Sequence, residues 1–206
     1  MTQPSKPTRN AASTRERILS VAQHHFKVNG YDACGLRDIA ADAGVNVALI
    51  NRYFGSKVEL FQKAVVDALQ VDDLLSGNKD TFGQDIASRM TWNDFDDDDF
   101  DPLLAFVKSL GSPAVGPLLS ARLTDHLVPA MARWIGGKAA KERAALILST
   151  LLGFDMLRRM AKLDSLQNGN RKAIVALAAR TLQGYVDGMP EQGDRSRPAK
   201  SRPAKR

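Results

Sequence analysis

The amino-acid sequence predicts an all-α protein. Apolar residues recur at spacings of three and four along most of the 206 residues, and aromatic residues make up only 6% of the composition. No stretch combines an alternating apolar and polar pattern with turn signals at both ends, as a strand would require. The chain is long enough for one large core, or for a small domain joined to a larger one.

Three short helices and the start of a fourth are predicted in the N-terminal part. Ser13 to Glu16 has the pattern of a capping box, which places the start of the first helix at Ser13, and Gly30 provides its C-terminal stop. A second helix ends at Gly44, and Asn46 can cap a third. A second capping box, Ser56 to Glu59, opens the fourth helix.

The rest of the chain also has helical periodicity, interrupted by glycine and proline. We expect helices over 103–110, 113–135, 139–163 and 170–186. The run 94–101, which holds six aspartates, is expected to be a solvated loop between helices. Beyond Pro190 a basic Ser-Arg-Pro-Ala-Lys repeat has too few apolar residues to build a core.

The net charge of +6 is unevenly distributed. Residues 1–63 carry 9 Lys or Arg against 5 Asp or Glu, residues 64–194 carry 14 against 18, and residues 195–206 carry 6 against none. A basic head and a basic tail around an acidic body fit a protein that meets a polyanion. The single cysteine, Cys34, excludes an internal disulfide, and no apolar run predicts a signal peptide or a membrane span, so we expect a cytoplasmic protein.

The second and third helices, joined across Gly44, have the size and turn of a helix-turn-helix, whose second helix enters the major groove of DNA. With Leu49 and Ile50 facing the core, the opposite face holds Val47, Ala48, Asn51 and Arg52. Small apolar groups beside an amide and a guanidinium suit the edges of bases, and Tyr53 and Lys57 suit phosphates. On spacing alone, a helical corner without function is an equally good interpretation.

The segments Thr14–Leu19, Leu36–Ala40, Ala43–Val45 and Tyr53–Lys57 are similar to the TetR family of bacterial repressors. The resemblance implies a three-helix DNA-reading domain. It assigns the DNA contacts to Arg37, Asn46, Val47, Ala48, Asn51, Arg52, Tyr53 and Lys57. Gly35 stands where the family usually has Ser or Thr, and Asn46 and Asn51-Arg52 also depart from the usual residues, so the operator sequence does not follow from the resemblance.

The resemblance further implies a C-terminal part that binds a small-molecule inducer and forms a homodimer through its last two long helices. The candidates for the dimer interface are Leu148, Leu152, Met156, Ile174, Leu177 and Leu182, with burial inside one subunit as the alternative. The candidates for the ligand pocket are Trp92, Phe95, Phe106, Met131 and Trp134, with Arg122 and His126 as polar contacts. Ordinary core packing is the alternative for each of them.

We therefore expect four segments: an arm over 1–12, a helix-turn-helix domain over 13–55, a helical ligand-binding and dimerisation domain over 56–188, and a basic tail over 189–206. The expected function is repression from a near-palindromic operator in the bacterial cytoplasm, relieved by an inducer. The alternative is an architectural DNA-binding protein without an inducer, whose tail supplies sequence-independent affinity.

Enzymatic and metal-binding functions are not expected. The sequence has no HExxH, Walker A or nucleophile-elbow motif. His24 and His25 lie on the first helix, where proximity to solvent or phosphate is the simpler interpretation, and the aspartate run lacks the glycine and glutamate of a calcium-binding loop. Cys34 has no second cysteine to pair with, so we expect it to be passive and expect no cofactor.

Overall fold

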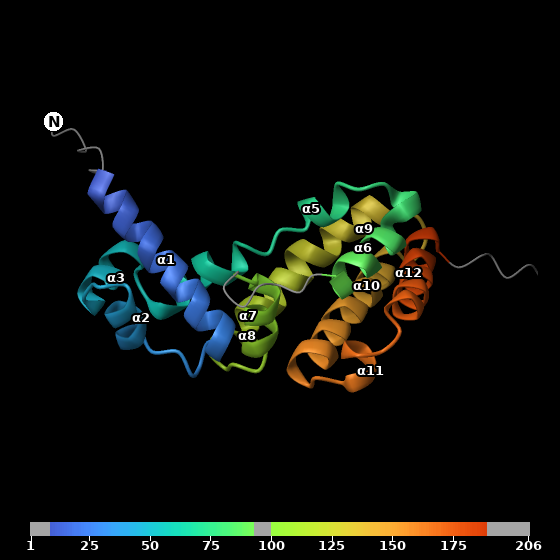
Figure 1. Ribbon diagram of the computed structural model, residues 1–206. Helices are drawn as coiled ribbons and strands as arrows, with labels where there is room; N and C mark the ends of the chain where they lie inside the picture. Colours follow the sequence, from blue (N-terminus) through green and yellow to red (C-terminus); the bar gives the residue numbers. More distant parts are fainter. Residues whose placement is uncertain (1–8, 93–99, 189–206) are drawn as a thin grey trace, which may run out of the picture.

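The computed structural model describes residues 9–92 and 100–188, and within them all regular secondary structure is helical. The expectations for Phe95, for the aspartates before Asp101 and for the basic tail fall outside these residues. The N-terminal elements are α1 (Arg9–Asn29), α2 (Leu36–Asp42), α3 (Val47–Phe54), α4 (Lys57–Phe61) and the π-helical turn η1 (Gln62–Val66) (Figure 1).

The remaining helices follow with short connections, and two further π-helical turns, η3 and η4, continue α-helices without a break. The elements are α5 (Asp72–Leu75), the 3-10 turn η2 (Lys79–Thr81), α6 (Phe82–Trp92), α7 (Pro102–Ser109), α8 (Gly116–Ala121), η3 (Arg122–Leu127), α9 (Val128–Ile135), α10 (Ala140–Asp155), η4 (Met156–Met160), α11 (Asp164–Gln167) and α12 (Arg171–Asp187).

Two of the three predicted helix caps are confirmed. Asn46 Oδ1 accepts a hydrogen bond from Leu49 N at 2.8 Å, and Ser56 Oγ accepts one from Glu59 N at 3.2 Å, so each side chain satisfies a free N–H of the first helical turn. The cap at Ser13 is wrong, because α1 already begins at Arg9 and Ser13 lies inside it. The favourable helix propensity of the preceding alanines explains the extension.

Helix α6 was not predicted from the sequence. Its buried residues Phe82, Ile86 and Ala87 have helical spacing, but Gly83 and several polar residues between them weaken the pattern. The predicted helix over 113–135 also begins later, at Gly116, after a turn. In the described ranges no helix has both the length and the apolar character that crossing a bilayer demands.

The first of two hydrophobic cores joins α1–α4 and η1 to α7 and α8. Phe61 lies at its centre, with its ring centroid 5.0 Å from that of Phe26 and 5.3 Å from that of Tyr31, both in edge-to-face contact. Phe106 of α7 and Leu119 of α8 are fully buried in the same core. The core of the N-terminal helices therefore extends beyond the expected domain limit at residue 55 and includes residues from the middle of the chain.

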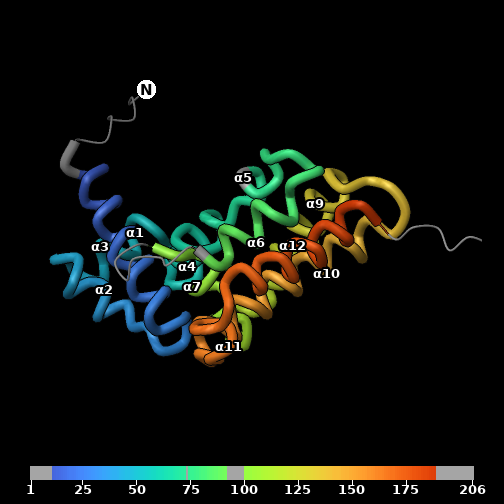
Figure 2. Tube along the Cα trace, turned by 45° about the vertical axis from the view of Figure 1, so that its right-hand side comes forward, coloured from blue at the N-terminus to red at the C-terminus, as the bar shows by residue number. Residues whose placement is uncertain are grey.

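The second core lies among α6, α9, α10 and α12. Met131, Ile147 and Leu182 are completely buried there, and Phe82 packs against Trp134 with 5.1 Å between the ring centroids. Helix α6 lies along α12 (Figure 2), and α10 packs against both α12 and α6. Helices α2 and α3 thus occupy one end of the molecule and α12 the other, with α7 and α8 between them (Figure 1).

We predict that Phe106→Ala lowers the free energy of unfolding by about 3 to 5 kcal/mol, because it leaves a cavity where a phenyl ring was 1% exposed. The matched control on the same segment is Leu110→Ala, whose side chain is 38% exposed, and it should cost less than about 1 kcal/mol. Urea denaturation monitored by circular dichroism measures both. Similar costs for the two variants would contradict a shared core.

Candidate nucleic-acid interface

Helices α2 and α3 form a helix-turn-helix. The turn between them needs a left-handed residue, which Gly44 supplies with a φ of +61°. Val45 N donates to Ala40 O at 2.9 Å, and the side chain of Asn46 then starts α3. Ile39 and Ala40 of α2 and Ile50 of α3 are buried against α1 in the first core, so the angle between the two helices is fixed by packing.

The outer face of α3 is exposed at one end of the molecule (Figure 1). Ala48, Asn51 and Arg52 are exposed, and their spacing of three and four places them on one side of the helix. Ile50 and Phe54 are buried on the opposite side. An amide, a guanidinium and a methyl group on one accessible helical face can read the donors, acceptors and methyl groups of base edges in the major groove.

The other expected contact residues border this face. Arg37 in the first turn of α2 and Asn46 before α3 are exposed. Val47, Tyr53 and Lys57 are half-buried, and Val47 and Tyr53 pack partly against the first core. Val47 is therefore less accessible than its predicted place on the outer face of the helix implies. Leu49, predicted to face the core, is half-buried.

Two cations near the end of α3 rest on aromatic rings. Lys57 Nζ lies 4.1 Å from the centroid of the Tyr31 ring, and Arg15 Cζ lies 5.0 Å from that of Phe54. These contacts hold the two charges beside the helix-turn-helix while leaving them available to phosphates. Arg15 was not among the predicted contact residues, because only the fold brings the start of α1 to the end of α3.

His25 and Cys34 in the DNA-binding part have structural roles rather than catalytic or metal-binding ones. His25 Nε2 lies 2.7 Å from Asp42 Oδ2, which ties α1 to α2. Cys34 is 2% exposed, and burial, the largest cause, raises the pKa of its thiol to about 11, so it is protonated at neutral pH. Among the described residues no three His, Cys, Asp or Glu side chains gather as metal ligands would.

Apart from Phe95, which lies outside the described residues, the residues expected to line a ligand pocket are not gathered in one place. Phe106 belongs to the first core and Met131 to the second, and Trp134 contacts Phe82. Trp92 ends α6, and its side chain lies outside the described part of the structure. Arg122 and His126 are brought together beside a hollow of about 210 Å³ that Gln70, Asp72, Asp125 and Arg133 also line. Phe106 and Trp134 thus pack in different cores, and the polar pair shares a cavity.

The residues expected in a dimer interface divide into three groups. Met156 and Leu177 are exposed, Leu148, Leu152 and Ile174 are half-buried, and Leu182 is completely buried in the second core. Leu182 is therefore turned toward its own subunit. The sequence analysis did not single out further exposed apolar residues beside them, namely Leu146, Leu157, Met160 and Leu163. The sequence feature that could have revealed them is the apolar pattern over 139–163, which covers more of the helix surface than one buried stripe needs.

Comparison with known proteins agrees with this geometry. Residues 80–186 match the family described as "Tetracyclin repressor-like, C-terminal domain", and residues 18–64 match "Bacterial regulatory proteins, tetR family". The chain belongs to the TetR family. It is therefore a DNA-binding transcription regulator of the helix-turn-helix type, and the sequence-based expectations of the family and of an all-α fold are confirmed.

Two solved TetR-family structures share the fold. A regulator from Streptomyces coelicolor A3 is 24% identical, with a TM-score of 0.55 over 90% of this chain and 100% of that one. A putative TetR-family transcriptional regulator from Mesorhizobium loti MAFF303099 is 18% identical, with a TM-score of 0.56 over 87% of this chain and 98% of that one. No curated protein sequence matches the chain significantly.

We predict that Asn51→Ala and Arg52→Ala each weaken specific DNA binding by about tenfold or more, because a bidentate contact to a base contributes about 1 to 3 kcal/mol. Both side chains are exposed, so the melting temperature should stay unchanged. Fluorescence anisotropy with a selected DNA duplex measures the affinity. The control is Arg89→Ala, an exposed arginine of α6. Equal affinities for all four proteins would place base reading elsewhere.

Proposed function

We propose that this TetR-family regulator binds a near-palindromic operator as a homodimer and represses transcription until a small effector releases it. The observation that carries the proposal is the exposed face of α3 with Ala48, Asn51 and Arg52, on a helix that Asn46 caps and the first core holds in place. Arg37, Tyr53 and Lys57 at its margins are suited to position the backbone phosphates. Since the operator would lie on the chromosome, we place the protein in the bacterial cytoplasm.

The proposed dimer interface is the outer face of α10, η4 and α12. Among the described residues, six of the eight large apolar side chains that are exposed lie between Leu146 and Leu177. Helices α10 and α12 pack side by side (Figure 2), and we place these side chains on one surface of the proposed dimer. On α12, Leu177 is flanked by the exposed small residues Ala173, Ala176 and Gly184, which allow a second helix to approach closely. Apolar surface of this kind marks an association site.

A two-fold dimer through this face would present two copies of α3 at the same side of DNA. Recognition helices in such dimers are separated by about 34 Å, one turn of the double helix, so their half-sites form a palindrome. Helix α12 of this interface and α3 lie at opposite ends of the subunit (Figure 1). The subunit therefore has to hold its DNA-binding helices at a fixed position relative to the dimer interface.

The hollow beside η3 is the proposed effector site. Arg122 Nη2 donates to Leu69 O at 2.8 Å, and its Nε is buried with no hydrogen-bond partner in the described structure. A ligand carrying a carboxylate or another strong acceptor would satisfy this donor. The wall formed by Gln70 and Asp72 directly follows η1, the continuation of α4. A ligand in the hollow would therefore contact the segment that leads out of the DNA-binding helices.

Selection of bound sequences from a random DNA pool at near-physiological salt tests the proposal. We expect an enriched near-palindrome with both the full protein and a variant that lacks residues 190–206, with somewhat lower affinity for the variant. Loss of sequence selectivity with the tail would instead favour an architectural DNA-binding protein. The enriched duplex then serves to screen small polar acids for release of the protein from DNA.

We predict that Leu177→Glu converts the dimer into a monomer, because a carboxylate in an apolar interface is desolvated without a partner. Leu177 is 65% exposed in the subunit, so the helical content should be unchanged. Analytical ultracentrifugation measures the mass. Leu110→Glu, at an exposed apolar residue far from α12, is the control and should remain dimeric. A dimeric Leu177→Glu variant would place the interface on another surface.

A further inference from the structure

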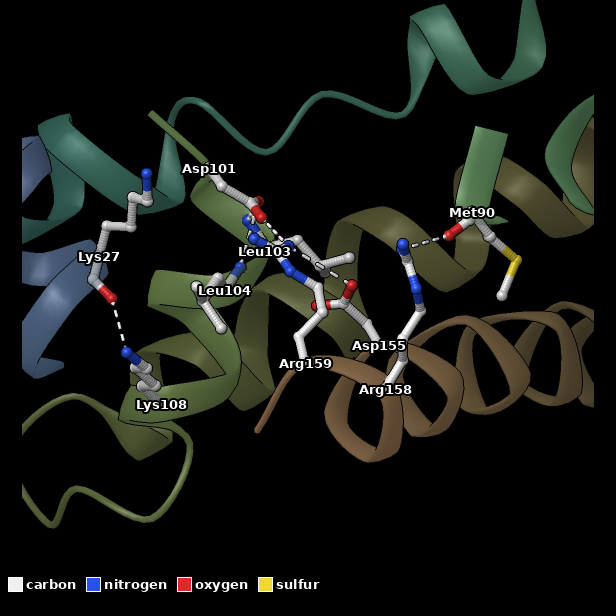
Figure 3. A network of polar contacts seen from close by, with 9 residues as sticks. All are labelled: Lys27, Met90, Asp101, Leu103, Leu104, Lys108, Asp155, Arg158 and Arg159. Atoms are coloured by element: carbon white, nitrogen blue, oxygen red, sulfur yellow. Dashed lines mark hydrogen bonds and ion pairs between the residues drawn. The ribbon is translucent and has the colours of Figure 1, made fainter. Parts of the chain in front are cut away.

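Helix α7 connects the dimer face to the DNA-binding head through polar contacts at both of its ends (Figure 3). It lies between the two ends of the molecule and buries Phe106 in the first core. One end meets η4, which carries the exposed Met156, Leu157 and Met160 of the proposed interface. The other end meets the last turn of α1. The eight residues of α7 therefore lie between the proposed dimer face and the DNA-binding helices, whose relative position has to be fixed.

The N-terminal end of α7 is fixed by Asp101. Its Oδ1 accepts hydrogen bonds from Leu103 N at 2.9 Å and Leu104 N at 3.2 Å, which caps the helix. Its Oδ2 accepts a hydrogen bond from Arg159 Nη1 of η4, and the Asp101 side chain is 1% exposed. A charge buried to this degree depends on its partner, so loss of Arg159 would leave an unpaired carboxylate at this end.

Arg159 also lies near Asp155 in the preceding turn. Asp155 Oδ1 is 3.4 Å from the same Nη1, and its Oδ2 is buried without a hydrogen-bond partner among the described residues. Burial, the largest cause, raises the pKa of Asp155, and the neighbouring Arg159 opposes this effect. The shorter contact of Arg159 is with Asp101, so the guanidinium is directed toward α7 rather than along its own helix (Figure 3).

The C-terminal end of α7 holds the end of α1 and the loop that follows it. Lys108 Nζ donates to Lys27 O at 3.0 Å and to Val28 O at 2.8 Å, two carbonyls of the last turn of α1. Tyr31 N donates to Ser109 Oγ at 3.0 Å, and Ser112 Oγ lies 2.8 Å from Asp32 Oδ1.

Gly30 allows the close approach of the two helices. It has a φ of +69°, and a Cβ there would lie 3.0 Å from Lys108 O. The end of α1 is therefore held by side chains of α7 at a short backbone distance, and the positive φ favours glycine at this position.

We propose that α7 acts as a strut that sets the position of the DNA-binding head relative to the dimer face. Arg159, Asp101 and Lys108 are then positioning residues that determine which spacing between operator half-sites the dimer accepts. This inference rests on the proposed dimer. Successive base pairs are only about 3.4 Å apart along the helix axis, so a displacement of the heads by a few ångströms changes the preferred half-site spacing.

Arg159→Gln and Lys108→Met remove the contacts at the two ends of the strut independently. Arg158→Gln is the matched control for the first, because Arg158 on the same π-helical turn donates from Nη1 to Met90 O at 3.0 Å, within the body (Figure 3). Lys138→Met is the control for the second, since Lys138 is exposed in the segment before α10 begins, outside the proposed interface. Arg159→Lys retains a cation that can reach Asp101. It should therefore keep part of the parent's narrow distance distribution and spacing preference.

The distance between the two heads can be measured without DNA. A spin label at Ser20→Cys reports it by double electron–electron resonance, because Ser20 is exposed on α1 and the buried thiol of Cys34 reacts poorly. We expect a narrow distance distribution for the labelled parent protein and the controls, and a distribution at least about twice as wide for Arg159→Gln and Lys108→Met. Distributions of equal width in all variants would overturn the inference.

Binding to a series of operators provides the second measurement. The half-sites are kept, and the spacer is lengthened or shortened by one or two base pairs. The parent should prefer one spacing by about tenfold or more, as expected for a rigid dimer, while Arg159→Gln and Lys108→Met should bind the series within about threefold. Circular dichroism and ultracentrifugation establish that each variant is folded and dimeric.

The outcomes separate the two proposals. If the labelled parent gives no intersubunit signal, there is no dimer, and both the proposed function and the strut are overturned. If the parent shows a sharp preference for one spacing, and Arg159→Gln and Lys108→Met keep that preference, the proposed function is supported and only the strut is overturned. A change in Arg158→Gln or Lys138→Met as large as in the strut variants would also overturn it.

Discussion

The DNA-binding helices of this regulator share their core with the body. A segment of this size buries a smaller fraction of its surface than a larger domain does, so its stability alone would be marginal. The core that holds the ring of Phe61 also contains Phe106 of α7 and Leu119 of α8, which add buried apolar surface to it. The orientation of α3 is therefore set partly by residues from the middle of the chain, and the DNA-binding head and the body share apolar packing as well as a covalent connection.

The shared core also decides where charge can be placed. Because the inner faces of α1 and α3 are filled by apolar side chains, the cations of the head lie at its margins, where Arg15 and Lys57 rest on the rings of Phe54 and Tyr31. Cations held in this way lose little hydration and keep their attraction for phosphates. In the proposed interface, Ala48, Asn51 and Arg52 would distinguish bases, so affinity and selectivity would depend on different side chains of one small surface.

Local patterns predicted what depends on neighbours in sequence. The caps at Asn46 and Ser56 and the exposed positions of Asn51 and Arg52 follow from spacing within a few residues. Contacts between distant segments did not follow: the bond from Lys108 to the end of α1 joins residues 80 positions apart. Leu177 and Leu182 both belong to the apolar pattern of the last helix, although Leu177 is exposed and Leu182 is buried. The pattern alone does not show which apolar residues face their own subunit.

The π-helical turn η3 holds an extra residue inside a helix that continues from α8 into α9. Because the wide turn absorbs this residue, the helical turns before and after it stay nearly in phase. Deleting the extra residue would leave an ordinary α-helix with the same flanking turns, whereas deleting a residue from a helix without a wide turn would rotate everything that follows by about 100° around the helix axis. This helix can therefore lose one residue at its wide turn and keep the packing of the turns on either side.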